Sequence, residues 1–345
     1  MGAFSWLHFS DLHLELNEKF STQYARKRLL GFLSAETAAG RLPYDYIFIT
    51  GDVANRGVYR GVPAFAKQLF EALGATDLSK VFWAAGNHDI PRKSRLRELV
   101  ISHIRSSKRS EELFEELMND PETRDVLLSK VIKDYARNHN KILGKQAFDI
   151  RHPSNPHVKY LLPDLNLIVL NTCLTSCDDN DDRNLFIRGG GLLSMFEGLD
   201  SGKPTFVIGH HGIEYFRQGE QDVLGSLFDS GGVDMYLCGH SHRLGYSDFP
   251  EASRTIHQIT CGGGAVKNPY KISFIHGQYD DGQSYSGDGD GSRSGGSVIL
   301  KPYSYAENGN REWQFDGSLH RKLNGRNKLE LTGCPAPSAP SHGRA

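Results

Sequence analysis

The sequence has few cysteines, no long apolar run and no excess of one charge. Its five cysteines among 345 residues are odd in number and widely scattered, which excludes a disulfide framework. No apolar run is long enough for a membrane span, and the first residues lack the pattern of a secretory leader. The 40 basic and 41 acidic residues give a net charge of −1, which excludes a protein that binds nucleic acid through overall basicity. We therefore expect a cytoplasmic protein with reduced thiols and no membrane partner.

Short apolar segments alternate with helical patterns along the chain. Such segments, bounded by polar or glycine-containing clusters, are typical of strands buried on both faces. We expect strands at Phe4–Phe9, Tyr46–Thr50, Val81–Ala85, Leu167–Asn171, Thr205–Ile208 and Val233–Cys238. We expect helices at Thr22–Ala38, Pro63–Leu73, Leu192–Leu199 and Gln221–Phe228. This alternation predicts an α/β layered fold, in which ligand sites gather beyond the strand ends.

Residues that can bind metals follow the expected strands in five short clusters. These are Asp11-Leu12-His13, Gly51-Asp52, Gly86-Asn87-His88-Asp89, His210-His211 and Gly239-His240-Ser241-His242. Side chains two positions apart in an extended segment point to the same side, so Asp11 and His13 can face one ion together. Together the clusters supply carboxylate, amide and imidazole groups, which a site for two divalent cations requires.

The five clusters, in this order, resemble the signature of the calcineurin-like metallophosphoesterase superfamily across residues 4–262. The resemblance implies a four-layer αββα fold, with two central mixed β-sheets flanked by helices and a dinuclear centre above the strand ends. It implies two ligand sets and a bridge between them: Asp11, His13 and His242 for one ion, Asn87, His210 and His240 for the other, and Asp52 shared by both. It also implies that His88 is not a ligand and sits over the substrate phosphate.

The chemistry of these residues is consistent with that assignment. Two adjacent cations lower the pKa of a bound water and neutralise phosphate charge, so hydroxide can attack phosphorus in line with the leaving oxygen. We expect Asp52, Asn87 and His88 to be catalytic, with His88 donating a proton to the departing alkoxide. Manganese or an iron-containing pair is expected from the family, while zinc or cobalt would also suit the ligands.

Three further residues are expected around the substrate or behind the ligands. His211 is expected to lie outside the ligand set or to contact substrate. Asp89 either orients His88 and its loop or caps a helix before Pro91. Arg92 begins a basic run to Arg109 with the single acid Glu98, which either contacts phosphates or is a solvated helix face.

The expected organisation divides the chain into a catalytic domain and smaller segments. We assign residues 1–91 and 145–332 to the catalytic domain and 92–144 to a helical insertion that forms either a lid or a nucleic-acid-binding surface. The polar segment 280–296 is expected to be a flexible loop, followed by a hairpin of Ser297–Tyr305 with Glu312–Phe315, and the tail 333–345 to be disordered.

The function expected from these observations is hydrolysis of a phosphodiester, in a cyclic nucleotide or a nucleic acid. The alternatives are a phosphomonoesterase or protein phosphatase of the same fold, and a nuclease or effector module that binds a protein partner through its C-terminal region. A catalytically inactive interaction scaffold is disfavoured because no ligand of the signature is missing.

Overall fold

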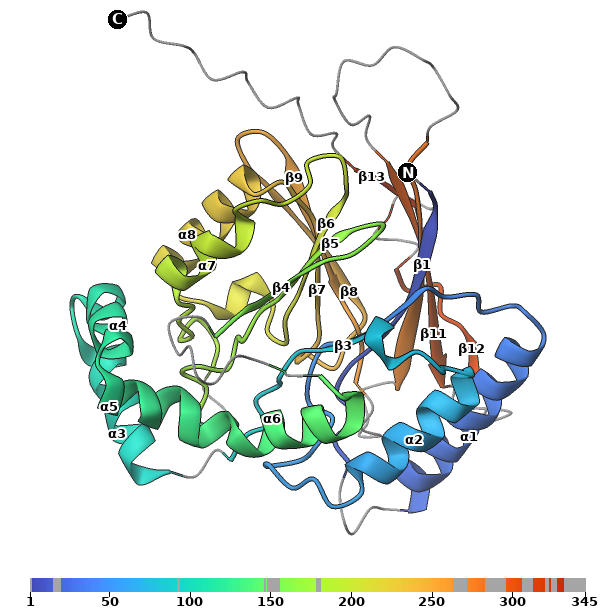
Figure 1. Ribbon diagram of the computed structural model, residues 1–345, viewed down its shortest axis with the longest axis horizontal. Helices are drawn as coiled ribbons and strands as arrows, with labels where there is room; N and C mark the ends of the chain where they lie inside the picture. The colour runs from blue at the N-terminus through green and yellow to red at the C-terminus, as the bar shows by residue number, and fades with distance from the viewer. Residues whose placement is uncertain are drawn as a thin grey trace, which may run out of the picture.

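The computed structural model describes most of the chain and places it in two β-sheets flanked by helices (Figure 1). The described residues are 2–14, 20–91, 94–145, 147, 156–177, 181–263, 272–282, 296–305, 313–319, 323 and 328–331. Three expectations therefore lie wholly or partly outside the described residues: Arg92, most of the loop 280–296 and the tail 333–345.

The first sheet contains the N-terminal strands and the C-terminal hairpin. Its order is β12-β11-β10-β1-β2-β3, and β13 also pairs with β11. The strands are β1 (Phe4–Phe9), β2 (Tyr46–Ile49), β3 (Val81–Trp83), β10 (Ser273–Asp280), β11 (Ser297–Tyr305), β12 (Trp313–Phe315) and β13 (Lys328–Glu330). Strands β1, β2 and β3 are parallel, so the loops that follow them leave the same edge of the sheet.

The second sheet has the order β4-β5-β6-β7-β9-β8. Its strands are β4 (Val158–Leu161), β5 (Asn166–Val169), β6 (Thr205–Ile208), β7 (Val233–Cys238), β8 (Gly245–Pro250) and β9 (Thr255–Thr260). Strands β5, β6, β7 and β9 are parallel, while β4 and β8 pair antiparallel at the two edges. Both sheets are therefore mixed, as the family resemblance implies.

Helices cover the outer face of each sheet, which completes four layers (Figure 1). Helices α1 (Phe20–Ala38) and α2 (Val62–Leu73) pack beside the first sheet, and α7 (Gly189–Phe196) and α8 (Gln218–Ser230) beside the second. Short turns η1 (Leu78–Lys80) and η3 (Ile213–Tyr215) precede β3 and α8. None of the helices in the described part of the chain is long and apolar enough to cross a membrane.

Strand β1 shows how alternation creates two cores. Phe4 and Trp6 pack between the sheets against residues such as Phe206 of β6, while Leu7 and Phe9 belong to the core under α1 and α2. Gly277 of β10 lies opposite Trp6, and a β-carbon there would clash with the indole ring. Glycine at this position therefore makes room for a fully buried tryptophan between the sheets.

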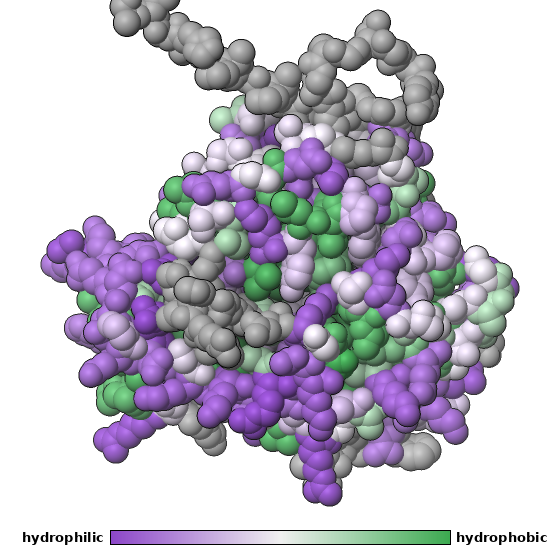
Figure 2. Space-filling model, viewed as in Figure 1, coloured by the Kyte–Doolittle hydropathy of each residue, from purple (hydrophilic) through white to green (hydrophobic). Residues whose placement is uncertain are grey.

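Helices occupy the segment expected to be inserted. They are α3 (Arg95–Ser106), α4 (Ser110–Asn119), α5 (Pro121–Arg124), the π-helical turn η2 (Asp125–Ser129) and α6 (Lys130–Leu143). On the side shown in Figure 2, the surface of α3, α4 and α5 is mostly hydrophilic. The Tyr135 hydroxyl of α6 donates a hydrogen bond to the carbonyl of Trp83, which ties α6 to the end of β3. The expected domain boundaries themselves stay a prediction.

The other expected elements are close to those observed. Strands β1, β6 and β7 begin and end at the expected residues, and α1, α2, α7 and α8 differ only at their ends. The expected C-terminal hairpin corresponds to the antiparallel pair β11 and β12. Strands β4, β8, β9, β10 and β13 were not anticipated. The half-exposed β4 and β8 lie at sheet edges, where burial imposes no continuous apolar run.

Candidate metal centre

The loops that follow the parallel strands of the two sheets meet at one edge of the sandwich. The loop after β1 runs beside the loop after β2, because the amide of Asp11 donates to the carbonyl of Gly51 and that of His13 to the carbonyl of Asp52. In the second sheet, the amide of Gly239 after β7 donates to the carbonyl of His210 after β6. The clusters predicted from sequence therefore come together in space.

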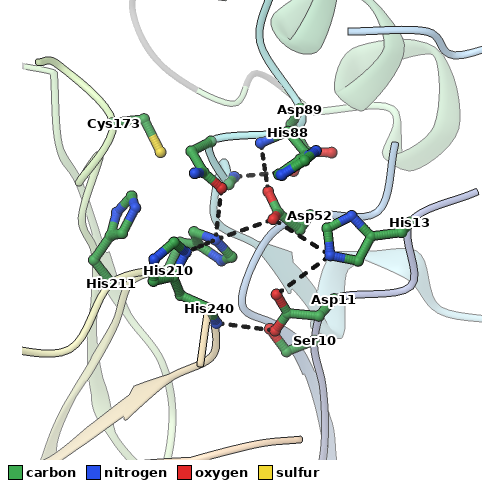
Figure 3. Close-up of polar contacts among 12 residues, drawn as sticks. Ser10, Asp11, His13, Asp52, His88, Asp89, Cys173, His210, His211 and His240 are labelled. Atoms are coloured by element: carbon green, nitrogen blue, oxygen red, sulfur yellow. Dashed lines mark hydrogen bonds and ion pairs between the residues drawn. The ribbon is translucent and has the colours of Figure 1, made fainter. Parts of the chain in front are cut away.

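Asp52 lies in the middle of the assembled residues (Figure 3). Its Oδ2 is 3.6 Å from His13 Nε2 and 3.3 Å from His210 Nε2, so one carboxylate oxygen lies within reach of histidines from both sheets. Its Oδ1 accepts a hydrogen bond of 2.6 Å from the backbone amide of His88. The side chain is 1% exposed. A carboxylate in this position can face two cations at once.

On one side of Asp52, Asp11, His13 and His242 place one ligand atom each within 4.8 Å of one another. His13 Nε2 is 2.9 Å from His242 Nε2, and His242 Nε2 is 3.3 Å from Asp11 Oδ1. That Oδ1 is buried and accepts no hydrogen bond in the described structure. Two imidazole nitrogens and one carboxylate oxygen therefore face the same small space. This donor set suits a divalent cation.

On the other side, His210 Nε2 is 3.2 Å from Asn87 Oδ1 and 3.3 Å from His240 Nδ1. His210 Nδ1 lies 2.8 Å from the carbonyl oxygen of Thr50, so that nitrogen holds a proton and the neutral ring has its Nε2 available for a cation. The residues fit a second cation as they fit the first. All of the predicted ligands are therefore brought together by the fold.

The predicted ligands stand out by their backbone conformation. Asp11, His13, Asp52, His240 and His242 have φ values of 54°, 42°, 53°, 66° and 56°, in the left-handed region. Such values are uncommon for residues with a side chain, and each strains the backbone by about 1 kcal/mol or more. Among the other described residues, only Arg56 and Arg183 and several glycines share a positive φ. Strain concentrated at the strand ends aims these side chains into the shared space.

Glycine is required at one of these turns by close approach. A β-carbon on Gly86 would clash with the backbone nitrogen and the carboxylate of Asp52. The loop after β3 therefore approaches Asp52 more closely than any other residue type would allow. This packing brings Asn87 and His88 up to the central carboxylate.

The electrostatics of the cluster favour positive charge. Burial opposes ionisation of Asp52, but the neighbouring His210 and His13 outweigh it and lower the pKa of Asp52. Burial likewise disfavours the charged form of His210, yet the carboxylates of Asp52 and Asp11 raise its pKa to about 9. The same negative potential would attract divalent cations.

His88 points into the cluster and is held from behind by Asn55. Asn55 Oδ1 lies 2.9 Å from His88 Nδ1, which fixes the proton on that nitrogen and turns the rest of the ring toward His13. The side chain of His88 is partly exposed, as are those of His240 and His242, whereas the other predicted ligands are buried. Asn55 was not anticipated. The signal was its place three residues after Asp52, on the same loop.

Asp89 connects two loops of the site. Its Oδ1 accepts a hydrogen bond of 2.8 Å from the amide of Ala54, and its Oδ2 accepts one of 2.9 Å from the amide of Gly86. The alternative in which Asp89 caps a helix is wrong, because the next helix begins at Arg95 and Ser94 caps it. Burial and the nearby Asp52 raise the pKa of Asp89 to about 7.

His211 is fully buried, and one of its ring nitrogens lies within 4.8 Å of ring nitrogens of His210 and His240. Its Nδ1 lies 3.0 Å from Thr172 Oγ1, and its Nε2 lies 3.6 Å from Asp181 Oδ2. Asp181 was not anticipated from sequence, although it also accepts a hydrogen bond of 3.3 Å from Asn87 Nδ2. Only an acid-rich run at 178–182 marked it, and no spacing rule linked that run to position 87.

The basic run of helix α3 is divided between the interior and the surface. Arg97 is fully buried and donates hydrogen bonds to the carbonyls of Cys173, Leu174 and Ser176. Arg105 contacts the carbonyl of Thr175 and the carboxylate of Asp181. For these two arginines the phosphate-contacting alternative and the solvated-face alternative are both wrong, because each guanidinium binds the protein itself.

A family model described as calcineurin-like phosphoesterase matches residues 4–244, which is more than half of the chain. This chain belongs to the calcineurin-like phosphoesterase family. The match spans the strands and loops that assemble the candidate metal centre, and membership of the family supports metal-dependent hydrolysis of phosphoric esters.

Individual proteins similar to this phosphoesterase include the uncharacterized metallophosphoesterase-like protein YydB of Bacillus subtilis. The two are 24% identical over 273 residues, which covers 77% of this chain and 54% of that protein, so the chain spans about half the length of this relative. A purple acid phosphatase from yellow lupin matches at 11% identity and a TM-score of 0.45, covering 87% of this chain and 51% of that one. GAP50 of Plasmodium matches at 12% identity and a TM-score of 0.42, covering all of both chains.

Proposed function

We propose that this calcineurin-like phosphoesterase is a metal-dependent phosphodiesterase with a dinuclear centre. The observation that carries the proposal is the position of Asp52, whose Oδ2 lies 3.6 Å and 3.3 Å from the Nε2 atoms of His13 and His210. A carboxylate shared by two neighbouring donor sets is what a bridging ligand requires. Family membership supports the same chemistry.

We assign the ligands to two ions. Asp11, His13 and His242 would hold one, and Asn87, His210 and His240 the other, with Asp52 between them. When bound, the two cations would neutralise charge on the phosphate and make water a better nucleophile at neutral pH. Manganese is our first expectation, and iron, zinc or cobalt would suit the same donors.

His88 is assigned to the leaving group. It is partly exposed, and its Nδ1 lies 2.9 Å from Asn55 Oδ1. With the Nδ1 proton fixed in this way, a protonated ring has its Nε2–H available for the phosphate and the departing oxygen. Proton donation matters most for a poor alkoxide leaving group, which favours a diester substrate.

A cavity with basic lining residues, which shares the loop after β1 with the candidate metal centre, favours a substrate that extends beyond the reacting phosphate. The cavity has a volume of about 530 Å³ and begins at Leu14, the residue after His13. Its lining includes Lys27 of α1 and Arg60, which lies just before α2, and both side chains are exposed. The positively charged side chains of Lys27 and Arg60 would bind further phosphates of a nucleotide or nucleic-acid strand.

The decisive experiment compares bis(p-nitrophenyl) phosphate with p-nitrophenyl phosphate. Protein stripped of metal and refilled with manganese should cleave the diester much faster than the monoester. Asp52→Asn should lower diester hydrolysis by about a thousandfold or more, because it removes the charge shared by both ligand sets. Atomic absorption should find two manganese ions per chain in the parent protein and fewer in the variant.

Other outcomes would redirect the proposal. Faster cleavage of the monoester would favour the phosphomonoesterase or protein phosphatase alternative. Two bound ions without hydrolysis of either ester would favour a module that acts only with a partner. Failure to bind any metal would contradict the proposal itself.

A further inference from the structure

Asp181 is a buried carboxylate that contacts Asn87 of the candidate metal centre and Arg105 of helix α3, and it lies near His211. It is 2% exposed. Its Oδ2 accepts hydrogen bonds of 2.5 Å from Ser176 Oγ and 3.3 Å from Asn87 Nδ2. Its Oδ1 lies 3.4 Å from Arg105 Nη2. A buried charge with several specific partners is held in one orientation and in turn restricts theirs.

The contact with Asn87 decides which end of that amide faces the metal centre. The oxygen and nitrogen of a carboxamide are almost equal in size, so only hydrogen-bond partners distinguish the two orientations. The ionised carboxylate of Asp181 accepts hydrogen bonds and donates none, and it therefore selects the Nδ2 end. Oδ1 is left 3.2 Å from His210 Nε2, on the side where a cation would lie.

The contact with His211 follows the same logic. Thr172 Oγ1 accepts the backbone amides of His210 and His211 at 3.3 Å and 3.2 Å, so its own proton is available for His211 Nδ1 at 3.0 Å. The remaining ring proton of His211 then lies on Nε2, which faces Asp181 Oδ2 at 3.6 Å. His211 has a ring nitrogen within 4.8 Å of those of His210 and His240, but a protonated Nε2 does not bind a metal, so Thr172 and the nearby Asp181 together disfavour His211 as a ligand.

Helix α3 fixes Asp181 from the opposite side. Arg105 holds its Oδ1 and the carbonyl of Thr175, and Arg97 holds carbonyls of the segment 173–176. Both arginines come from helix α3, in the segment 92–144 that the sequence alone predicts to be either a lid or a nucleic-acid-binding surface. These buried contacts make α3 part of the scaffold behind the ligands.

We propose that Asp181 is a positioning residue of the second metal ion, which orients the amide of Asn87 and is itself held by Arg105 of helix α3. The proposal rests on the proposed function, in which Asn87 is a ligand. The competing interpretation is that Asp181 only pairs with Arg105 to stabilise the fold.

The test is the binding of manganese alone, measured by calorimetry and by electron paramagnetic resonance. Asp181→Asn keeps the shape of the side chain but can either donate or accept, so the Asn87 amide loses its preferred orientation. We expect the second manganese ion to bind about 10- to 100-fold more weakly, with the first little affected. At a metal concentration that fills both sites of the parent protein, the spin-coupled signal of a pair should give way to the signal of isolated manganese. Asp182→Asn is the matched control, because Asp182 is the exposed next residue and should change neither result.

The outcomes separate this inference from the proposed function. If the parent protein binds two coupled ions and Asp181→Asn does the same with equal affinity, the positioning role is wrong and the proposed function stands. If the parent protein binds no pair of ions, both are wrong. Should Asp181→Asn fail to fold, Arg105→Gln is the second variant to test. It keeps the carboxylate of Asp181 but removes the charged group that holds it in place. A several-fold weaker second ion in Arg105→Gln would support the inference, and unchanged affinity would overturn it.

Discussion

The strand-end loops and helix α3 both bury polar side chains, but they treat them in opposite ways. In the loops, side-chain atoms that can bind metals gather around one space, as with the 2.9 Å between the Nε2 atoms of His13 and His242. In α3, Arg97 is equally buried but donates to the carbonyls of Cys173, Leu174 and Ser176. The first arrangement suits a bound cation, whereas in the second the two terminal nitrogens of the guanidinium bind carbonyls of the protein itself.

This difference shows when a buried polar group indicates function. A buried carboxylate oxygen without a hydrogen-bond partner, combined with a strained backbone, marks a site built for a ligand, as at Asp11. Buried charge with ordinary hydrogen bonds marks a structural role, even within a basic run such as that of α3. The predictions below test the two sides of this contrast.

The largest effect is expected at His88, which belongs to the loops but is not assigned as a ligand. His88→Asn should lower kcat for diesters with alkyl leaving groups by about 10²–10⁴-fold, because the proton donor is lost. The effect should be smaller for a p-nitrophenyl leaving group, and two manganese ions should still bind. The exposed His103 of α3 provides the control, since His103→Asn should leave kcat unchanged. Loss of metal in His88→Asn would show that His88 is a ligand instead.

A second effect is expected at Arg97, on the other side of the contrast. Arg97→Met should reduce the free energy of unfolding by about 3 kcal/mol, because three carbonyls lose a charged donor in the interior. Urea denaturation is the measurement. Arg95→Met, on the same helix but exposed, should change stability by less than about 0.5 kcal/mol. Equal stability of the two variants would mean that α3 does not depend on the buried guanidinium.

A third effect is expected where basic side chains remain at the surface. Lys27→Gln combined with Arg60→Gln should raise KM for an oligonucleotide about tenfold and leave kcat unchanged. In a plot of the logarithm of the binding constant against that of the salt concentration, the slope should become shallower by about two. Bis(p-nitrophenyl) phosphate should be cleaved as before, because it carries no further phosphate. Lys67→Gln, another exposed lysine, is the matched control. An unchanged KM would place the rest of the substrate elsewhere.

The smallest effect is expected at Glu220, a buried carboxyl outside both regions. It accepts a hydrogen bond of 3.0 Å from the amide of Ile187, and burial together with Glu115 and Glu111 raises its pKa to about 8. Between its unfolded value and pH 8 the folded state therefore holds a proton that the unfolded state releases, so this residue makes stability fall as pH rises. The slope is at most about 1.4 kcal/mol per pH unit.

Glu220→Gln should flatten this part of the profile, because the amide oxygen can still accept from Ile187 and no longer ionises. Urea denaturation at pH 5 to 8 is the measurement. Parallel profiles for parent and variant would show that Glu220 is not held in its neutral form.

The contrast also explains how much could be predicted from the sequence. The gathering of the proposed ligands could be predicted because each follows a continuous apolar strand, and parallel strands bring their ends to one edge. Strands β4 and β8 were missed because edge strands carry no such signal. Asp181 was missed because its contact joins positions 94 apart, which no local pattern records. The inward turn of Arg97 was missed because composition does not reveal which way a side chain faces.

The two sheets contribute different ligands to each proposed ion, so the ions would crosslink the sandwich. Asp11 and His13 follow a strand of the first sheet and His242 follows a strand of the second, and Asn87 and His210 divide in the same way. Trp6 lies buried between those sheets and would report their separation by its fluorescence. Metal loss and exposure of the indole should then occur together, because the interface between the two sheets extends to the candidate metal centre.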